Sequence, residues 1–572
     1  MSLRSRSGES RPFNLRATHI MTAVVTSALL LTGGVVLAED HEGHDDNGGP
    51  GPHPALYSPT CPPNIHGDVS AAIGDRPALL RHLDQGDIDS GRAGFYDILA
   101  QGLAVFNAEW TTLDGAGRPL TGGSGQALAF RSKYQFRRTT GAGPDGNSCF
   151  GCHSSPRGGG GGSRSTNLFL GFSVADQAID ANGLPTQNAL SIDFSHCNER
   201  NPPNLFGDGP LEVASREMSF ALQAIRSAAL AQAAASGQPV TMNLVAKGVS
   251  FGKITATPDG HIDPSQIEGC DWDLIIKPFG WKGGLNIRSF EVGGMNLHFG
   301  MQPREKFGRG TDPDGDGVTD ELFCGDMTAE EVWTAALSPP GQVITGTRAQ
   351  QSAIIRGKQI FDSSLCAVCH IPKMYLDNPV FTAPGPFNAK AALFSVGVES
   401  PEGQVTNTFS TSRPFSFDLT RDGPRPRIDR TPDGRGVIEA YTDLKRHIIS
   451  EADSGGVEFS RFNNEILPGG TLAGQDAATS FTVTPTPLPA PYFITAKLWG
   501  VGNTGPYGHR GDITTITENI NFHGGEARAS RDAFFAMSKD DQNAVVAFLR
   551  SLQIVPDGGP RIVRDNNGGD DH

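Results

Sequence analysis

After Leu37 the sequence has no long apolar run, and it is short of basic residues throughout. Nothing beyond that point is apolar for long enough to span a bilayer, so we expect no membrane span once the N-terminal segment is removed. Lys and Arg number 47 against 62 Asp and Glu, which gives a formal net charge of −15. This acidity argues against nucleic acid and anionic membrane surfaces as partners.

The one apolar run, Met21 to Leu37, follows four arginines and ends in the small-residue stretch Val36-Leu37-Ala38. This order is typical of a secretory signal peptide, here over residues 1–38 with a long basic region. Residues 39–55 are polar and predict a flexible linker. We therefore expect a periplasmic or otherwise exported protein. An uncleaved membrane anchor is the alternative, although the run is short for a stable span.

Cysteine is scarce, with 8 in 572 residues, yet four of the eight form two copies of one pattern. The copies are Cys149-Phe-Gly-Cys152-His153 and Cys366-Ala-Val-Cys369-His370. Cysteines three apart share one face of a helical turn, so both thiols can reach the vinyl groups at one porphyrin edge. The adjacent histidine can then bind the iron. The pattern predicts two covalent c-type haems with His153 and His370 as proximal ligands.

Two other uses of a Cys-x-x-Cys pair remain open, a redox dithiol or half of a zinc site. The histidine in both copies favours haem. The remaining cysteines are Cys61, Cys197, Cys270 and Cys324. An even number in an exported chain permits two disulfides in any of three pairings, with free buried thiols as the alternative.

A weak internal repeat precedes the two attachment sequences. Gly102-Leu-Ala-Val-Phe106-Asn stands before the first and Gly357-Lys-Gln-Ile-Phe361-Asp before the second. Because Gly (72) and Pro (40) are abundant, we expect much loop. The predicted fold is mainly α with extensive loops. Two cytochrome c-like domains, 56–345 and 346–556, would each bind one covalent haem, with short β segments in the N-terminal insertion, and 557–572 would be a disordered tail.

Local patterns place several elements. Helical spacing runs from Asp87 to Trp110, and an alanine-rich helix is predicted over Leu211–Ser236. Val240–Gly252 and Gly260–Pro278 predict short strands joined by turns. Ser538 is the expected N-cap of a helix that closes the second domain.

An acidic loop, residues 312–321, lies between the two attachment sequences. Oxygen ligands at positions 1, 3, 5, 7 and 9 of a calcium loop would come from Asp312, Asp314, Asp316, Val318 and Asp320. Gly317 stands at position 6, but Phe323 occupies position 12, where a bidentate Glu is expected, and Glu321 could substitute. A plain acidic turn is the alternative to a calcium site.

Several short sequence segments resemble those of the bacterial di-haem oxidoreductase family of peroxidases. This family is related to di-haem cytochrome c peroxidases and to the di-haem enzyme that matures methylamine dehydrogenase. The segments span about residues 95–555. They are Gly143-Pro-Asp-Gly-Asn-Ser-Cys149-Phe-Gly-Cys-His153, Asn198-Glu-Arg-Asn-Pro, Gly209-Pro-Leu-Glu-Val-Ala-Ser-Arg-Glu-Met218, Met295-Asn-Leu-His298-Phe-Gly-Met-Gln302, Tyr441-Thr-Asp-Leu-Lys-Arg-His447, Leu498-Trp-Gly-Val-Gly502, Pro506-Tyr-Gly-His509 and His523-Gly-Gly-Glu526.

The resemblance implies that the haems face each other, that the C-terminal one is six-coordinate and passes electrons, and that calcium lies near the interface. In the peroxidase relatives the second axial ligand comes fourteen residues after the histidine of Pro-Tyr-x-His, which is His523 here. His509 and His447 are its rivals. The chain departs from the family where Ile448-Ile449-Ser450 replaces the usual Asp-Met-Gly and where Arg510 replaces Asp.

The resemblance also implies residues near the first haem. In the relatives a Trp is followed by a pocket Gln ten residues later and a Glu twenty later; counting from Trp281 gives Glu291 and Met301. This places Glu291 and His298 at the distal face as candidate proton carriers, with Trp281 as a candidate electron path. For each, a purely structural role is the alternative.

The predicted function is therefore that of an exported di-haem peroxidase. Hydrogen peroxide or a similar small oxidant would react at the N-terminal haem, and a small redox protein would supply electrons through the C-terminal haem. Two alternatives remain, a non-catalytic di-haem electron-transfer cytochrome and a maturation or oxygenase enzyme that acts on another substrate.

Overall fold

The computed structural model describes residues 76–116, 147–162, 167–170, 197–281, 283, 286–312, 316–387, 411–449, 492–509, 511 and 513–565. All of them belong to one compact unit of the chain. Within these ranges no helix is both long and apolar enough to cross a membrane. The predicted signal peptide and linker, 1–38 and 39–55, lie outside the described residues.

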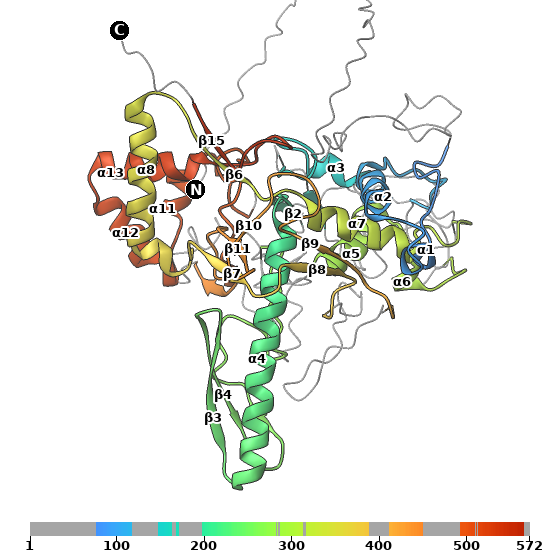
Figure 1. The fold of residues 1–572 in the computed structure, drawn as a ribbon, viewed down its shortest axis with the longest axis horizontal. Coiled ribbons are helices and arrows are strands. Elements are labelled where there is room, and N and C mark those ends of the chain that lie inside the picture. Colours follow the sequence, from blue (N-terminus) through green and yellow to red (C-terminus); the bar gives the residue numbers. More distant parts are fainter. Residues whose placement is uncertain are drawn as a thin grey trace, which may run out of the picture. The chain divides into compact units, whose positions relative to one another are not determined.

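Two similar helix pairs organise the two halves of the chain (Figure 1). In the first, α2 (Phe95–Asn107) packs on α7 (Cys324–Ala336), and in the second, α8 (Arg348–Ser363) packs on α13 (Lys539–Ser551). The weak repeat in the sequence marks the first helix of each pair, so it corresponds to a structural repeat.

A glycine allows each pair to cross closely. A Cβ atom on Gly102 would lie 2.1 Å from the carbonyl oxygen of Ala329 on α7. A Cβ atom on Gly357 would lie 1.9 Å from the carbonyl oxygen of Ala544 on α13. Both distances are far below van der Waals contact, so a larger residue would push the helices apart. The repeated glycine is therefore a requirement of the packing.

The predicted helices are found with small shifts at their ends. The region with helical spacing forms α1 (Gln85–Asp89) and α2. The alanine-rich helix is α4 (Asp208–Ser236), which ends at Gly237 with φ +66°. The Ser538 side chain accepts a hydrogen bond from the Asp541 amide (3.2 Å) at the start of α13, as the predicted cap requires.

The sequence between α4 and α5 (Ile287–Phe299) forms a small antiparallel sheet. Its strand order is β3 (Val240–Ala246), β4 (Val249–Ala256), β5 (Ile262–Asp263). Figure 1 shows the two long strands running beside the lower part of α4, onto which β3 packs. The short strands predicted in this region are thus confirmed.

Strands are not confined to the N-terminal insertion, however. Small sheets also form in the second half of the chain, where β7 (Met374–Leu376), β8 (Val380–Ala383), β9 (Phe415–Asp418), β10 (Asp429–Arg430), β11 (Gly436–Ile438), β12 (Arg446–Ile448) and β13 (Tyr492–Ile494) pair as β10-β11-β7, β8-β9 and β12-β13. In the first half, β1 (Asn167–Leu170) pairs with β2 (Cys197–Arg200). The prediction of a mainly α fold is confirmed only in part, because the described chain is mixed, with helices and many small sheets.

The end of the chain corrects another prediction. Residues 557–565 are not a disordered tail, since β15 (Ile562–Arg564) pairs in parallel with β6 (Gly341–Ile344). On the other side β6 pairs with β14 (Leu552–Gln553). Arg561 adds ion pairs to Asp429 (2.6 Å) and Glu439 (2.7 Å). These long-range partners, which composition cannot indicate, hold the segment in place.

Short helices complete the described fold: α3 (Cys149–Cys152), α6 (Arg304–Phe307), α11 (Ile516–Asn521) and α12 (Arg528–Ala536), with the 3₁₀ turns η4 (Leu365–Val368) and η5 (Gly525–Ala527). Helix α5 is packed in the interior, and Ile287, Val292, Met295 and Phe299 are buried on it.

Candidate functional site

Both Cys-x-x-Cys-His sequences are wound into a single helical turn that begins at a serine. Ser148 accepts a hydrogen bond from the Gly151 amide (3.1 Å) at the start of α3. Ser364 accepts one from the Cys366 amide (3.3 Å) at the start of η4. In each copy the histidine amide donates to the carbonyl of the first cysteine, 2.9 Å in both cases. The two sequences therefore present their cysteines and histidine in the same local geometry.

The two attachment sequences open into one cavity of about 400 Å³. Its wall includes Cys149, Cys152 and His153 from the first copy and Cys366, Cys369 and His370 from the second. Aromatic residues from many elements, among them Phe106, Phe279, Phe361 and Phe493, line the rest. A largely apolar cavity with a few polar groups is typical of a site for an organic cofactor.

Three histidines in the cavity wall are oriented as iron ligands are. Each donates Nδ1–H to a backbone carbonyl: His153 to Pro203 (2.9 Å), His370 to Tyr441 (2.9 Å) and His523 to Asn519 (2.8 Å). Because a carbonyl can only accept, each neutral ring carries its lone pair on Nε2, and such a second hydrogen bond orients metal-bound histidines.

The same three rings are neutral in the folded protein. Desolvation lowers the pKa of His153 to about 4 and that of His370 to about 4, and it also lowers the pKa of His523. Only a neutral imidazole can bind a metal. The residues predicted to hold two haems thus fit the group in both tautomer and charge.

His447, a rival for the second axial position, has a different environment. Its Nε2 bonds to Asp443 (2.8 Å) and its Nδ1 to Glu526 (2.7 Å). Burial lowers the pKa of His447, but its bonds to Asp443, Cys369 and Glu526 outweigh that effect and raise the pKa to about 11. Both nitrogens carry protons, so His447 has no lone pair for iron. His523 is the better placed of the two.

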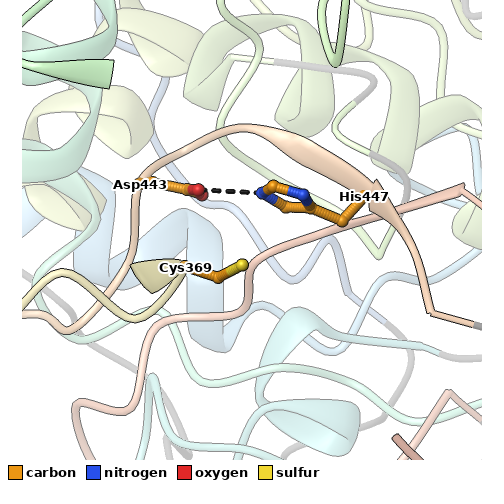
Figure 2. A group of neighbouring side chains, drawn as sticks. All are labelled: Cys369, Asp443 and His447. Carbon is orange, nitrogen blue, oxygen red and sulfur yellow. Dashed lines mark hydrogen bonds and ion pairs between the residues drawn. The ribbon is translucent and has the colours of Figure 1, made fainter. Parts of the chain in front are cut away.

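Cys369, Asp443 and His447 lie close enough together to suggest a metal site. Their ligand atoms lie within 4.8 Å of one another, and Figure 2 shows the Asp443–His447 bond with the Cys369 sulfur beside it. A histidine protonated on both nitrogens cannot ligate a metal. The group instead resembles a charge-assisted bridge, in which His447 joins two carboxylates.

This bridge fixes the loop that carries His523. Glu526 accepts hydrogen bonds from the Ile448 amide (2.8 Å) and from His447, and the Gly524 amide donates to Ile449 (2.8 Å). Gly525 is required here, since a Cβ atom on it would lie 2.3 Å from the Ile448 carbonyl oxygen. The loop is thereby attached at His447 and at the two residues that follow it.

Replacing His447 by glutamine should destabilise the protein in a pH-dependent way. The pKa of His447 is about 11 in the folded state against 6.5 for an ordinary histidine. The resulting stabilisation is complete below pH 6.5 and is lost as the pH rises toward 11, because only the folded state then keeps the proton. Urea unfolding of the di-haem protein at about pH 6 and about pH 9 should show a difference between wild type and H447Q that shrinks with pH.

The matched control is His261→Gln, which changes an exposed histidine whose side chain is 75% accessible. The difference in unfolding free energy between wild type and His261→Gln should not change with pH. A difference between wild type and H447Q that stays constant with pH would mean that His447 is not held as an imidazolium.

The predicted distal residues lie in the wall of the same cavity. Glu291 and His298 come from α5, and Trp281 comes from the segment before it. Trp281 donates its indole N–H to the Asn201 carbonyl (2.9 Å), and its ring centroid lies 5.7 Å from that of His509. His298 lies near enough to His153 to contribute to the lowering of its pKa.

Glu291 is buried and protonated. It accepts a hydrogen bond from the Thr334 hydroxyl (2.7 Å), and its other oxygen is buried without a hydrogen-bond partner. Desolvation and the nearby charge of Glu330 raise the pKa of Glu291 well above its usual range. A carboxyl group whose pKa is raised in this way keeps its proton to higher pH, so of the two directions open to a proton carrier Glu291 is suited to donation.

Residues 491–552 match the model of a family described as "Di-haem oxidoreductase, putative peroxidase". Over these residues the chain matches the di-haem oxidoreductases. The resemblance seen in the sequence is confirmed over this stretch, which contains His509 and His523. The family's description implies two haems and a peroxide substrate.

The other comparisons add little to the di-haem oxidoreductase match. No curated protein matches the chain. Among solved structures, a Kuenenia stuttgartiensis hydrazine synthase under xenon pressure is similar at 13% identity, over 55% of this chain and 77% of that chain, with a TM-score of 0.21. A likeness this weak does not define the fold.

The predicted calcium loop has other partners at two positions. Asp320 bonds to Arg304 (2.7 Å) and to the Gly310 amide (2.7 Å). Glu321, the possible substitute for the missing bidentate ligand, accepts from the buried Gln302 amide (2.6 Å). Asp312 accepts from the amides of Asp316 (3.2 Å) and Gly317 (3.0 Å), and the Asp316 side chain accepts from the Val318 amide (2.8 Å). Asp314 lies outside the described residues, and a calcium site stays a prediction.

Two of the four remaining cysteines are described in full. Neither Cys270 nor Cys324 is in a disulfide. Burial raises the pKa of both thiols. Cys61 and the side chain of Cys197 lie outside the described residues, so the pairing of these two stays open.

Sequence reasoning missed two acidic side chains that line this cavity, Asp208 and Glu330. Glu330 is 2% exposed, and its Oε1 lies 3.4 Å from the Sγ of Cys149. A signal existed, because Asp326, Glu330 and Thr334 recur every four residues and so share one face of α7. Polar residues at such spacing inside a buried helix indicate a functional face.

Proposed function

We propose that this protein is an exported di-haem c-type oxidoreductase that reduces peroxide. The first attachment sequence would hold the haem that meets peroxide, and the second would hold the haem that passes electrons. The proposal rests on one observation above all: both Cys-x-x-Cys-His turns, with His523 and Glu291, line a single cavity. The family match over 491–552 and the Arg-rich, then apolar, segment 1–38 support it.

Haem, when bound, supplies redox-active iron and a conjugated path for electrons. The residues of the chain would do the rest. The four cysteines would tether the two rings, and His153, His370 and His523 would hold their irons. The Trp281 indole, fixed by its bond to Asn201, would provide an aromatic group in the wall of the shared cavity.

The reduction of peroxide also requires a supply of protons. Reduction of hydrogen peroxide takes up two electrons and two protons, breaks the O–O bond and forms two water molecules. In this proposal His298 would accept a proton from peroxide and return it to the second water, and Glu291 would donate one to the departing oxygen; both side chains line the cavity. The electrons would come from a small redox protein through the second haem.

Electron relay without catalysis is the second candidate. His298 favours it, because a histidine so near His153 could occupy the sixth position of the first iron. In that case both sites would be closed to substrate.

Adding hydrogen peroxide to the reduced, full-length protein should distinguish the two candidates. We expect a high-spin absorption spectrum from one of the two haems that changes on addition of peroxide, with oxidation of two electron equivalents per peroxide. A low-spin spectrum that does not respond would contradict the peroxidase proposal and support relay. Cys270→Ser serves as the control, since that residue does not line the cavity.

A further inference from the structure

Helices α4, α5, α6 and α7 enclose a buried cluster of charged groups beside the first attachment sequence. Its members are Glu212 and Arg216 on α4, Arg288 and Glu291 on α5, Glu305 on α6, and Asp326, Glu330 and Glu331 on α7. All are less than a tenth exposed. Carboxyl groups clearly outnumber the two guanidinium groups.

The two arginines form ion pairs with three of the carboxylates. Arg216 pairs with Glu212 (2.5 Å), Arg288 pairs with Glu305 (2.7 Å), and Glu331 lies 3.3 Å from Arg288 and 3.7 Å from Arg216. Asp326 is held by neutral donors and by His82 (2.7 Å).

Glu291 and Glu330 have only neutral hydrogen-bond partners, Thr334 and Cys149. In each, the second carboxyl oxygen is buried without a partner. Both line the cavity wall. An ionised carboxylate in such surroundings is strongly disfavoured, so these two groups are expected to carry protons. In agreement, burial raises the pKa of Glu330 to about 8.

The contact between Glu330 and Cys149 provides independent support. In the structure the thiol can donate its proton across the 3.4 Å separation to Oε1. Once Cys149 is bonded to a haem vinyl group, its sulfur is a thioether with no proton to give. The same contact is then a hydrogen bond only if Glu330 supplies the proton. Haem attachment thus favours the protonated acid.

We propose that Glu330 stores the second proton of peroxide reduction and passes it to Glu291 after Glu291 has donated its own. This inference rests on the proposed function. Glu330 acts through Glu291 and is therefore a positioning and supply residue. In this step the O–H bond of the Glu330 carboxyl group breaks and an O–H bond forms on the carboxylate of Glu291. The electrons for peroxide reduction come from the redox partner already named.

The position of Glu330 on α7 indicates a route by which its carboxylate is reprotonated. Asp326 lies one turn earlier and Thr334 one turn later on the same face. Asp326 bonds to His82, whose side chain is 30% exposed. In this proposal the row would carry protons from the surface at His82 toward Thr334, which contacts Glu291.

The groups that set the charge of Glu330 come from α3, α5 and α7 itself. Burial is the main cause of its raised pKa, the Cys149 contact and Arg288 oppose it, and Asp326 adds to it. Glu291 faces it from α5, and its own pKa is raised in part by Glu330. Burial of the two acids thus opposes the ionisation of both, and the pKa of Glu330 is raised to about 8.

Infrared difference spectroscopy of the full-length di-haem protein tests this directly. We expect a carboxylic acid C=O band at neutral pH that shifts in D₂O and is lost as the pH is raised through about 8. The band should be weaker in Glu330→Gln and retained in Glu330→Asp. A wild-type spectrum without any such band would overturn the proposal, even if no variant folds.

Peroxide turnover supplies the second readout. Glu330→Gln should lower it by about 10²-fold while leaving both haems attached and the visible spectrum unchanged. The fall in wild-type rate near pH 8 should be absent in Glu330→Gln and kept in Glu330→Asp. Unchanged turnover and pH profile in Glu330→Gln would overturn the proposal. If the wild type does not reduce peroxide at all, the proposed function fails, and the infrared band still decides whether Glu330 holds a proton.

Discussion

Replacing Cys366 and Cys369 by alanine should reduce the covalently bound haem from two per chain to one. Both thiols lie on the turn at η4, and both line the cavity next to His370. Without the thioethers, the second haem would be held only by its axial ligands and by apolar contacts, which denaturant removes. The first attachment sequence, Cys149 to His153, lies on a separate turn and should be unaffected.

The measurement is haem that stays with the polypeptide after acid–acetone extraction, together with iron per chain before extraction. Wild type should retain two haems, and C366A/C369A should retain one. The reciprocal variant C149A/C152A should also retain one, and Cys270→Ser should retain two. Loss of all haem from wild type on extraction would show that neither sequence binds haem covalently, and the proposed function would fail with it.

Replacing Glu291 by glutamine should lower peroxide turnover by about 10² to 10⁴-fold, the usual effect of removing a general acid. Glutamine keeps the size of the side chain, and its carbonyl can still accept the hydrogen bond from Thr334. The cavity should therefore keep its shape while it loses the proton that goes to the departing oxygen. Haem content and the spectrum of the second haem should not change.

The pH dependence of wild-type peroxide turnover follows from the protonation of Glu291. A general acid works only while it is protonated, and desolvation raises the pKa of Glu291 well above its usual range. Activity should thus be present at neutral pH and be lost as the pH rises, the opposite of what an ordinary carboxyl acting as a base would give. The matched control is Glu217→Gln on α4, outside the cavity, which should be near wild type. Normal turnover in E291Q would show that Glu291 is structural.

Local features of this fold could be predicted from the sequence because neighbouring residues determine them. The helical turns that present Cys149, Cys152, Cys366 and Cys369 depend on spacing and on a preceding serine. Helices α4 and α13 follow from composition, apolar periodicity and caps.

The repeated phrases at Gly102 and Gly357 also marked two equivalent helices correctly, since each glycine serves the same close helix crossing. Long-range partners explain the errors. Strand β15 exists because β6 pairs with it, and no property of residues 557–565 alone indicates that partner.

The functional roles of individual side chains depended even more on tertiary contacts. By its sequence alone His447 was as good a ligand as His523. Asp443 and Glu526, brought to its two nitrogens, make it a cation, whereas Asn519 leaves His523 in the tautomer that has its lone pair on Nε2. Glu330 became notable only when α7 packed against α3 and placed its carboxyl beside Cys149.

The sequence by itself thus determined which residues can be bonded to haem, because that chemistry lies within five consecutive residues. Only the tertiary structure decided that the two attachment turns share one cavity and that Glu291 and Glu330 are buried in its wall, where desolvation raises their pKa values. The reason is physical: bonding patterns are local, whereas desolvation and charge pairing depend on what the rest of the chain packs around each group.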